Sequence, residues 1–543
     1  MRRKFLPLAA ASALFVAAAA CSDDDTSEVT VPTTIDSIDD ELDIDPITTD
    51  SMDPTTTESS DTTEPDDTTT TEPTDTTDPD APAVVTGFAG SWLADDLASL
   101  ELTEPNTIPV IDSALADERV SDDHWVWDWW PVRDRDGQVA EIDGVSIAVA
   151  LSAPADVLPG KRHDIATHRY LVTDDGGRSW TDGGELFPED SQELLGTRQW
   201  AGSAMYDDET GTLYAFYTAA GEDDDNDRAE STTSTTTESS DEPSGIRSTE
   251  STTSLASTEP TTTESTGSDE PAPDDDQVAP SGGSVGDDIS YRQRLAVATA
   301  ELSIVDGEVR FDDWSDHEVL LTGAETGLYA TTQATEGGAG QIDAFRDPWY
   351  HRDEETGEEY LLFTATMPYA ECEGDGVVGI ARATTDDLRE WEVLPPMFDG
   401  HCINNELERP HIVIEDDLSY LLFTTHAHTF RDGTSGPEGL YGFVADDFLG
   451  TYEPLNETGL VLANPEEAPY QAYSWMTLPN GVATSFFQFF DIGGDVEISY
   501  IGDQSPEFQR EHFGGTFAPS LLIDFVDDAT EIVEVLEPGQ LAP

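Results

Sequence analysis

Residues 345–363 read FRDPWYHRDEETGEEYLLF, which is a polar motif, an acidic turn and an aromatic–aliphatic run in that order. The same layout occurs in residues 199–217 and 407–423. In each copy a nearly constant distance separates the centre of the motif from the phenylalanine of the apolar run: 16 residues from Trp200 to Phe216, 16 from Asp347 to Phe363, and 15 from Glu408 to Phe423. This spacing predicts one hairpin unit that the chain uses repeatedly.

A fourth unit begins at Trp127–Pro131 (WDWWP) and leads through a longer acidic turn to an apolar run. Such β-type runs, separated by turn signals and without long helical periodicity after residue 20, predict an all-β fold. They lie at 145–153, 213–219, 360–366, 420–425 and 482–490.

Sheets repeated around one axis form a β-propeller, whose innermost strands approach that axis. Equivalent positions of the units then face each other, so we expect Asp128, Asp347 and Glu408 to surround one pocket. The alternative is that these hairpins are ordinary solvated turns. A Trp, Arg or Pro stands beside each acid, where a turn more often has Gly and Asn, and this argues against the alternative.

The charge of the chain excludes one class of function and directs attention to two tracts. The 543 residues include 23 Lys and Arg against 115 Asp and Glu, a net charge of -92, which excludes nucleic-acid binding through a basic surface. Residues 21–83 and 222–288 are rich in Thr, Asp, Glu, Ser and Pro and cannot bury enough apolar surface to fold. We therefore expect a disordered tether, and a folded domain over 84–543 that a disordered loop insertion interrupts.

The first 21 residues indicate export. A basic start at Met1–Lys4 precedes an apolar run from Phe5 to Ala20, which predicts a signal peptide over residues 1–20 and is too short for a comfortable membrane span. Small residues directly before Cys21 resemble a bacterial lipobox, in which this cysteine receives the lipid. We expect a protein held at the bacterial cell surface by a lipid anchor only, the alternative being ordinary cleavage after Ala20 with Cys21 incidental.

Three acids around an axis are suited to glycosyl chemistry. Two carboxyl groups about 5 to 5.5 Å apart are the equipment of a retaining glycosidase or glycosyltransferase. Asp128 is the candidate nucleophile, and Glu408 the candidate acid/base, because a Glu in a partly desolvated pocket keeps its proton near neutral pH. Asp347 is a candidate for binding sugar hydroxyls and stabilising the positive charge of the transition state.

The neighbours of the acids have two interpretations. Tryptophan faces are platforms for sugar rings, but Trp127, Trp129 and Trp130 are equally suited to the core, and we expect core packing for at least one of them. For Arg346 the structural alternative is an ion pair that neutralises Asp347.

Together these motifs resemble glycoside hydrolase family 68, the levansucrases and related bacterial β-fructofuranosidases. The resemblance runs in one order through the folded portion, over residues 127–131, 200–204, 346–348, 406–411, 436–443, 473–474 and 515–519. It implies a five-bladed propeller that acts on sucrose without a cofactor, through a fructosyl–Asp128 intermediate, with fructan or water as the acceptor. Asp128 would be the nucleophile, Asp347 the transition-state stabiliser and Glu408 the acid/base. The positions implied to line the fructosyl and neighbouring subsites are Trp127, Trp200, Arg346, Glu406, Arg409, His426 and Tyr473.

Three positions bear on the subtype. Ala201 stands where the family usually has a Ser whose hydroxyl supports the nucleophile, and we expect this to weaken or retune the site unless another hydroxyl or a water substitutes. His426 occupies the position of an Arg in many Gram-positive members, and is as in the proteobacterial type. Asn405 replaces an Asp that binds calcium in some members, so we expect no metal.

Cys372 and Cys402 flank the segment that leads to Glu408. Their pairing resembles a disulfide of some proteobacterial members and would hold the acid/base loop. Two free buried thiols are the alternative.

Rival functions remain open. Residues 173–180 (TDDGGRSW) resemble the Asp-box of sialidases, which is a structural hairpin turn. A propeller that binds surface glycans without cleaving them is a second rival, although such a protein has no need of three acids. Within family 68 the triad does not discriminate a levansucrase, which transfers fructose to fructan, from an invertase, which transfers it to water.

Overall fold

The computed structural model describes residues 90–188, 198–221, 290–323, 327–331, 343–368, 372, 375–431, 433–493, 498 and 501–543. All of them belong to one compact unit, Thr77–Pro543. The expected signal peptide (1–20), the lipidated Cys21 with its tether (21–83) and the insertion (222–288) lie outside the described residues. No helix in the described ranges has the length and apolar character that crossing a bilayer requires.

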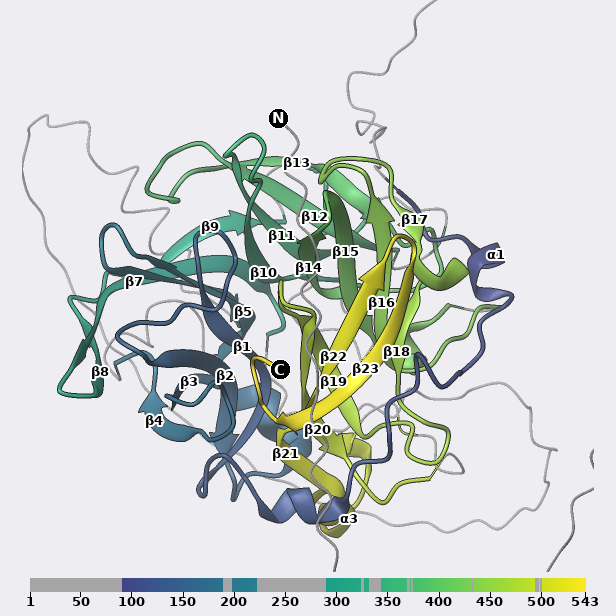
Figure 1. The fold of residues 1–543 in the computed structure, drawn as a ribbon, viewed down its shortest axis with the longest axis horizontal. Coiled ribbons are helices and arrows are strands. Elements are labelled where there is room, and N and C mark those ends of the chain that lie inside the picture. The colour runs from purple at the N-terminus through teal and green to yellow at the C-terminus, as the bar shows by residue number, and fades with distance from the viewer. Residues whose placement is uncertain are drawn as a thin grey trace, which may run out of the picture. The chain divides into compact units, whose positions relative to one another are not determined.

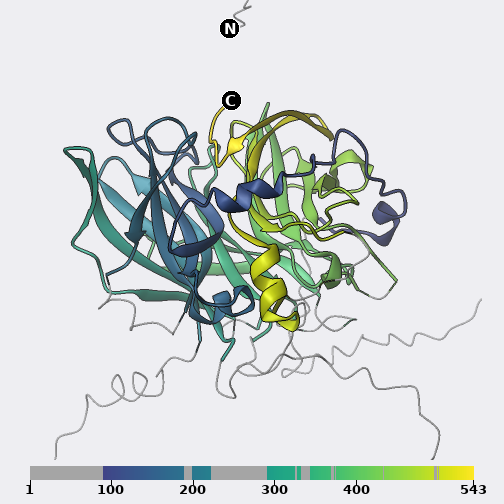
Figure 2. The same cartoon turned by 90° about the horizontal axis from the view of Figure 1, so that it is seen from below.

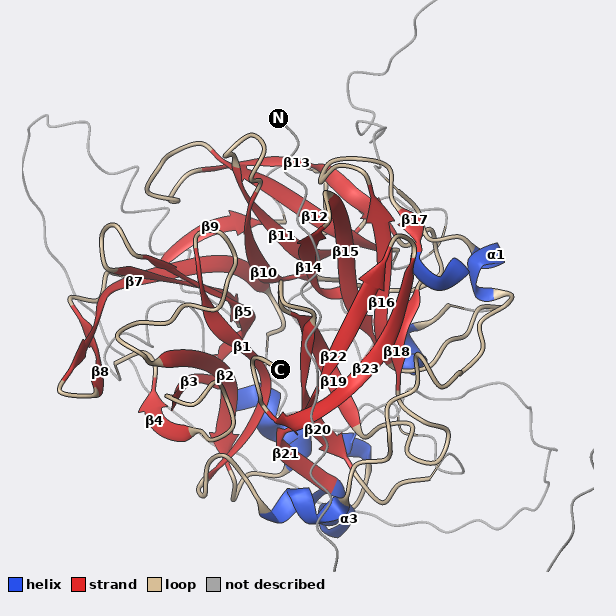
Figure 3. Cartoon of the chain, viewed as in Figure 1, coloured by secondary structure: helices blue, strands red, loops and turns tan. Residues whose placement is uncertain are grey.

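The described residues are mainly β-structure, as Figure 3 shows, and form four sheets. The largest contains β1 (His124–Asp134), β2 (Ser146–Pro154), β3 (Thr167–Thr173), β4 (Thr181–Glu185), β5 (Arg198–Asp207), β6 (Thr212–Ala220), β7 (Gln293–Val305), β8 (Glu308–Asp312) and β9 (Glu318–Thr322). The second contains β10 (Phe345–Arg352), β11 (Glu359–Thr366), β12 (Gly376–Ala383) and β13 (Trp391–Asp399). The third contains β14 (Glu408–Glu415), β15 (Leu418–Thr425), β16 (Gly439–Ala445), β17 (Glu453–Pro454) and β18 (Leu460–Ala463). The fourth contains β19 (Ala472–Thr477), β20 (Val482–Phe489), β21 (Phe513–Phe517), β22 (Pro519–Val526) and β23 (Ala529–Pro538).

Helices are few and short among the described residues. They are α1 (Ala94–Leu97), α3 (Pro506–His512) and the 3-10 turns η1 (Ser113–Asp117), η2 (Pro159–Ile165), η4 (Ala427–Thr429), η5 (Leu455–Glu457) and η6 (Ile501–Asp503). Ser505 caps α3, because its side chain accepts a hydrogen bond from the Phe508 amide. α3 lies next to η2 at one end of the strands (Figure 2), where Gln509 Oε1 accepts a 3.0 Å hydrogen bond from the Gly160 amide.

The sheets follow one another in sequence order around a central region (Figure 1). β1 pairs in parallel with β5 on one side and packs against β19, β20 and β21 on the other, so the first and last sheets adjoin. The five expected apolar runs form β2, β6, β11, β15 and β20, which confirms the all-β prediction. These second strands of each antiparallel unit are buried almost throughout, which explains why they read as continuous apolar runs.

A β-bulge interrupts the first strand of each antiparallel unit at the level of the expected site. The register shifts lie between Trp127 and Trp129 in β1, Trp200 and Gly202 in β5, Arg346 and Trp349 in β10, Glu408 and His411 in β14, and Tyr473 and Met476 in β19. Four bulges contain a non-glycine residue with positive φ: Asp128 (38°), Asp347 (62°), Arg409 (51°) and Ser474 (61°). Bulges re-aim side chains, and such conformations concentrate at functional sites.

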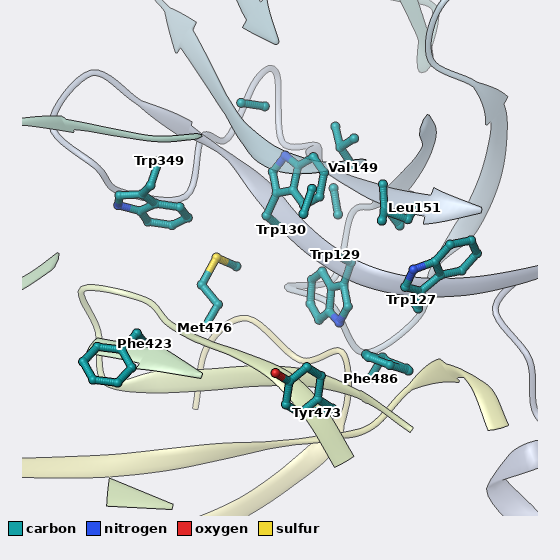
Figure 4. Close-up of a cluster of buried hydrophobic side chains, with 14 of the residues drawn as sticks. Trp127, Trp129, Trp130, Val149, Leu151, Trp349, Phe423, Tyr473, Met476 and Phe486 are labelled. Atoms are coloured by element: carbon teal, nitrogen blue, oxygen red, sulfur yellow. The ribbon is translucent and has the colours of Figure 1, made fainter. Parts of the chain in front are cut away.

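The tryptophans of β1 are buried, as expected for at least one of them (Figure 4). Trp129 stacks on Phe517 with 4.1 Å between ring centroids, and its Nε1 donates a 2.9 Å hydrogen bond to the Ser485 carbonyl. This indole therefore joins the first sheet to the fourth and has no polar group left for a ligand.

The Asp-box-like segment forms the turn between β3 and β4. Asp175 accepts hydrogen bonds from the amide (2.9 Å) and the hydroxyl (2.7 Å) of Ser179, and the Trp180 indole donates to the Gly539 carbonyl. The segment is a hairpin turn that ties the first sheet to residues after β23.

Candidate active site

One guanidinium holds together the acidic residues of two neighbouring sheets. Arg346 Nη2 donates a 2.7 Å hydrogen bond to Glu408 Oε1 and lies 3.4 Å from Glu406 Oε1, and its Nε lies 3.6 Å from Asp347 Oδ2. Its side chain is 9% exposed. Arg346 therefore does more than neutralise Asp347, because its shortest contact is with the predicted acid/base.

Threonines of the second strands support the bulges of the first strands. The Thr364 hydroxyl donates a 2.9 Å hydrogen bond to Asp347 Oδ2 and accepts one from the Arg409 amide. The Thr218 hydroxyl accepts from the Asp347 amide at 2.8 Å and donates to the Ala201 carbonyl at 2.9 Å. Each threonine thus fixes the backbone beside it in the next unit. Neither threonine was predicted as a site residue, although a Thr directly follows the aromatic run in each repeat.

Asp128 lies beside Arg409, Ser474 and Glu408. Burial raises the pKa of Asp128, whereas the Arg409 charge and a hydrogen bond with Ser474 act to lower it. Arg409 also donates 2.9 Å hydrogen bonds to the carbonyls of Trp129 and Ser474. Its guanidinium is therefore fixed beside Asp128.

The pKa values of Asp347 and Glu408 are shifted in opposite directions. Burial raises the pKa of Asp347 to about 7, and the Glu408 charge adds to this while Arg346 opposes it. Burial acts to raise the pKa of Glu408 as well, but Arg346, His426 and a hydrogen bond from Tyr473 together bring it below the ordinary value. In the free site three neighbours thus stabilise the Glu408 carboxylate, so its proton as acid/base has to come with the bound sugar.

Tyr473 contacts Glu408, and His426 stacks on Tyr473. The Tyr473 hydroxyl donates to Glu408 Oε2, and its ring stacks on His426 with 3.6 Å between centroids. His426 Nδ1 lies 2.8 Å from Glu438 Oε1, and the Glu438 charge raises the pKa of His426 against the effect of burial. Glu438 was not a predicted site residue, although it lies in a motif that carried the family resemblance.

Trp127 and Trp200 both contact His163, a residue that was not predicted. The Trp127 ring contacts the His163 ring edge-on at 5.4 Å, and Trp200 Nε1 donates a 3.1 Å hydrogen bond to the His163 carbonyl. Burial lowers the pKa of this histidine well below its ordinary value. His163 lies in η2, outside the repeated unit, so no pattern pointed to it.

The structure brings the three predicted acids together with five of the predicted subsite residues, Arg346, Glu406, Arg409, His426 and Tyr473, whereas Trp127 and Trp200 contact His163. β1, β10 and β14 supply Asp128, Asp347 and Glu408, and the bulges and interstrand hydrogen bonds direct these side chains to one centre. Three carboxyl groups at one centre supply what nucleophilic attack, proton transfer and charge stabilisation at one bond require.

Calcium does not fit the position of Asn405. Its Oδ1 accepts a 2.7 Å hydrogen bond from Arg431 Nη2, which places a positive charge beside the neutral amide. In the described residues there are two clusters that each contain three side chains of metal-binding types. In one, Cys372 and Cys402 are bonded to each other as a disulfide, and in the other His426 is already paired with Glu438.

A cleft of about 470 Å³ lies apart from these residues, between the segment before β1 and the β22–β23 hairpin. No aromatic residue lines this cleft, and none of the predicted site residues lines it. We therefore assign the chemistry to the carboxylate centre.

Known proteins with similar sequences are levansucrases and sucrases. A family model described as levansucrase/invertase matches residues 69–260 and 370–542. A levansucrase of Zymomonas mobilis is 30% identical over 456 residues, which cover 83% of this chain and 92% of that relative. An extracellular sucrase of the same organism is 27% identical over 77% of this chain and 87% of the relative. A levansucrase of Erwinia amylovora is 26% identical over 83% of this chain and 95% of the relative. These relatives are consistent with the proteobacterial type.

Solved structures show the same fold. An inulosucrase from Halalkalicoccus jeotgali bound to kestose has 35% sequence identity and a TM-score of 0.66, over 83% of this chain and 97% of that one. The full-length β-fructofuranosidase from Microbacterium saccharophilum K-1 has a TM-score of 0.62 at 23% identity, over 85% of this chain and 86% of that one. Because the family model matches more than half of the chain and the relatives match most of it, this protein belongs to the levansucrase/invertase family of enzymes, glycoside hydrolase family 68.

Proposed function

We propose that this protein is a retaining fructosyltransferase of the levansucrase type, which takes sucrose, releases glucose and transfers the fructosyl group to fructan or to water. The observation that carries the proposal is the contact of Arg346 with both Asp347 and Glu408 at a centre that also holds Asp128. The names of the relatives, levansucrase and extracellular sucrase, supply the substrate.

The reaction proceeds in two displacements at the anomeric carbon of the fructosyl group. Asp128 attacks that carbon while the bond between the carbon and the glucosyl oxygen breaks, and Glu408 gives its proton to the departing oxygen. An acceptor hydroxyl then passes its proton to Glu408 and attacks the same carbon, which frees Asp128. Asp347 is ionised in both transition states, where it lies beside the sugar ring and stabilises the positive charge of that ring.

Asp347 and Glu408 supply the proton as a coupled pair. In the free site the carboxyl with the raised pKa is Asp347, whereas the reaction needs the proton on Glu408. Positive charge that develops on the fructosyl ring favours ionised Asp347, and the proposal requires the proton to be on Glu408 at that point.

The fold of this enzyme is a propeller of five blades, with the nine-stranded sheet counted as two blades that join where β1 and β5 pair. Support comes from the inner strands β1, β5, β10, β14 and β19, since each begins one antiparallel unit and each has a bulge at the same level. The catalytic domain spans residues 84–543.

The enzyme is exported and anchored to the membrane through a lipid on Cys21. The sequence pattern of residues 1–25 supports this location. A metabolic label with an alkyne fatty acid tests it in the full chain: the wild type is labelled and sediments with membranes, and Cys21→Ser is unlabelled and released. An unlabelled wild type contradicts it.

Incubation with sucrose tests the function. Free glucose, free fructose and polymer are measured for the wild type and for Asp128→Asn. Glucose in excess of fructose, abolished by the substitution, supports transfer, and equal amounts indicate an invertase. Retained glycan binding without glucose release contradicts both and leaves a glycan-binding propeller.

A further inference from the structure

The strand that holds Asp128 lies between two other inner strands. β1 pairs in parallel with β5 on one side, with Val132 opposite Ala204, and contacts β19 on the other. Ala201 lies in the bulge of β5 and Ser474 in the bulge of β19. A side chain that supports Asp128 from a neighbouring bulge comes from one of these two strands.

The β5 side offers Asp128 no side-chain donor at its bulge. Ala201 is buried and has only a methyl group, and its carbonyl oxygen accepts the Thr218 hydroxyl. A buried carboxylate with a raised pKa needs donors from elsewhere to remain ionised and oriented.

The β19 side offers a hydroxyl whose direction is determined by its other partner. Ser474 is 3% exposed, and its Oγ accepts a hydrogen bond from Arg409 Nη1. A guanidinium only donates, so the single hydroxyl hydrogen of Ser474 is free to point at Asp128. Its hydrogen bond with Asp128 lowers the pKa of that carboxyl, opposite to the effect of burial.

We propose that Ser474 is the positioning residue of Asp128: its hydroxyl links the Arg409 guanidinium to the carboxylate and supplies from β19 the hydrogen bond that Ala201 cannot supply from β5. Arg409 is itself held by the Trp129 and Ser474 carbonyls at 2.9 Å each, so the donor that orients the hydroxyl is rigid. This role rests on the proposed function, in which Asp128 is the nucleophile.

Four variants test the proposal by their kcat/KM against pH: Ser474→Ala, Ser474→Gly, Ala201→Ser and the double variant Ala201→Ser/Ser474→Ala. The glycine variant removes the hydroxyl without strain at a position whose φ is 61°. Loss of a hydrogen bond to a charged group predicts a fall in kcat/KM of about 10- to 100-fold for Ser474→Ala and Ser474→Gly. It also predicts an acid limb about one pH unit higher, since Asp128 must be ionised to attack.

The rescue and the control separate positioning from packing. In the double variant the hydroxyl returns on the β5 side, and we expect at least a threefold recovery of kcat/KM over Ser474→Ala with the acid limb moved back. Ser485→Ala is the matched control, because Ser485 is also buried and its hydroxyl has no hydrogen-bond partner. An acid limb that stays in place in both Ser474 variants, or moves as far in Ser485→Ala, overturns the proposal.

Crystal structures keep this test independent of the proposed function. If the wild type releases no glucose from sucrose, the proposed function fails, and the Asp128 carboxylate is compared in the wild type, Ser474→Gly and the double variant. A carboxylate that turns away from Arg409 in Ser474→Gly and returns in the double variant supports the positioning role. An unmoved carboxylate in Ser474→Gly overturns it.

Discussion

Arg346 Nη2 donates a 2.7 Å hydrogen bond to Glu408 Oε1, so the residue next to one acid in the sequence makes its shortest contact with the other. This contact and the Tyr473 hydroxyl occupy both oxygens of Glu408. Both groups stabilise the carboxylate, which is why the predicted acid/base has a lowered pKa in the free site. Whether Glu408 carries a proton therefore depends on its contacts with Arg346 and Tyr473.

Arg346→Lys keeps the charge but loses the planar fork that reaches Asp347, Glu406 and Glu408 together. We expect kcat/KM on sucrose to fall about 100-fold, the typical effect of removing one preorganised donor. Arg352→Lys is the control on the same strand, because Arg352 pairs with Asp136 at the surface. Equal activities of the two variants would contradict the account.

Tyr473→Phe removes the donor to Glu408 and keeps the ring that stacks on His426. Because the hydrogen bond from Tyr473 lowers the pKa of Glu408, its loss raises that pKa. The acid must be protonated to act, so the basic limb of kcat/KM moves up by about one pH unit. Tyr452→Phe is the control, since that buried hydroxyl donates to the Phe448 carbonyl. A basic limb that stays or moves down refutes the prediction.

The disulfide between Cys372 and Cys402 closes a loop with a sequence separation of 30 residues. Cys372→Ser/Cys402→Ser is expected to lose about 3 to 4 kcal/mol of unfolding free energy by the chain-entropy estimate. Urea unfolding with and without reductant measures it, and the reductant should destabilise only the wild type. Free thiols titrated in the unfolded, unreduced wild type would show that the bond is absent.

His411 makes the unfolding free energy depend on pH. Its Nδ1 lies 2.9 Å from the Arg409 carbonyl and its Nε2 accepts from the Thr477 amide, which selects the neutral tautomer. Burial lowers its pKa from 6.5 to about 3. Between these values the unfolded chain binds a proton that the folded chain does not. Stability contributed by neutral His411 is thus present above pH 6.5 and falls by about 1.4 kcal/mol per pH unit toward pH 3.

Urea unfolding of His411→Gln between pH 6.5 and 4 measures this effect. The slope of unfolding free energy against pH should decrease by about one proton relative to the wild type. His401→Gln is the control, because His401 is exposed in a loop. An unchanged slope in His411→Gln would exclude His411 as the source.

The sequence predicts the strands well because the repeated hairpin has a strong local signal. The spacing that relates Asp347 to Glu408 also predicts their meeting, since equivalent positions of successive units face one centre. The lowered pKa of Glu408 was not predicted, because it depends on Arg346, His426 and Tyr473 together, and only the folded chain brings these three around one carboxyl.

Two further residues were beyond the sequence for physical reasons. His163 lies in a 3-10 turn outside the repeat, and only the folded chain brings its ring against Trp127. Ser474 acquires its partners through a bulge with positive φ, which the local sequence does not encode.

The most direct test of the central claim is to identify the residue that carries the sugar. The wild type is quenched in acid during steady-state turnover of sucrose and digested with pepsin, and its peptides are weighed. We predict one hexosyl unit on the peptide that contains Asp128, and none in Asp128→Asn. A hexosyl unit on another peptide, or glucose release without any adducted peptide in the quenched sample, would contradict the account.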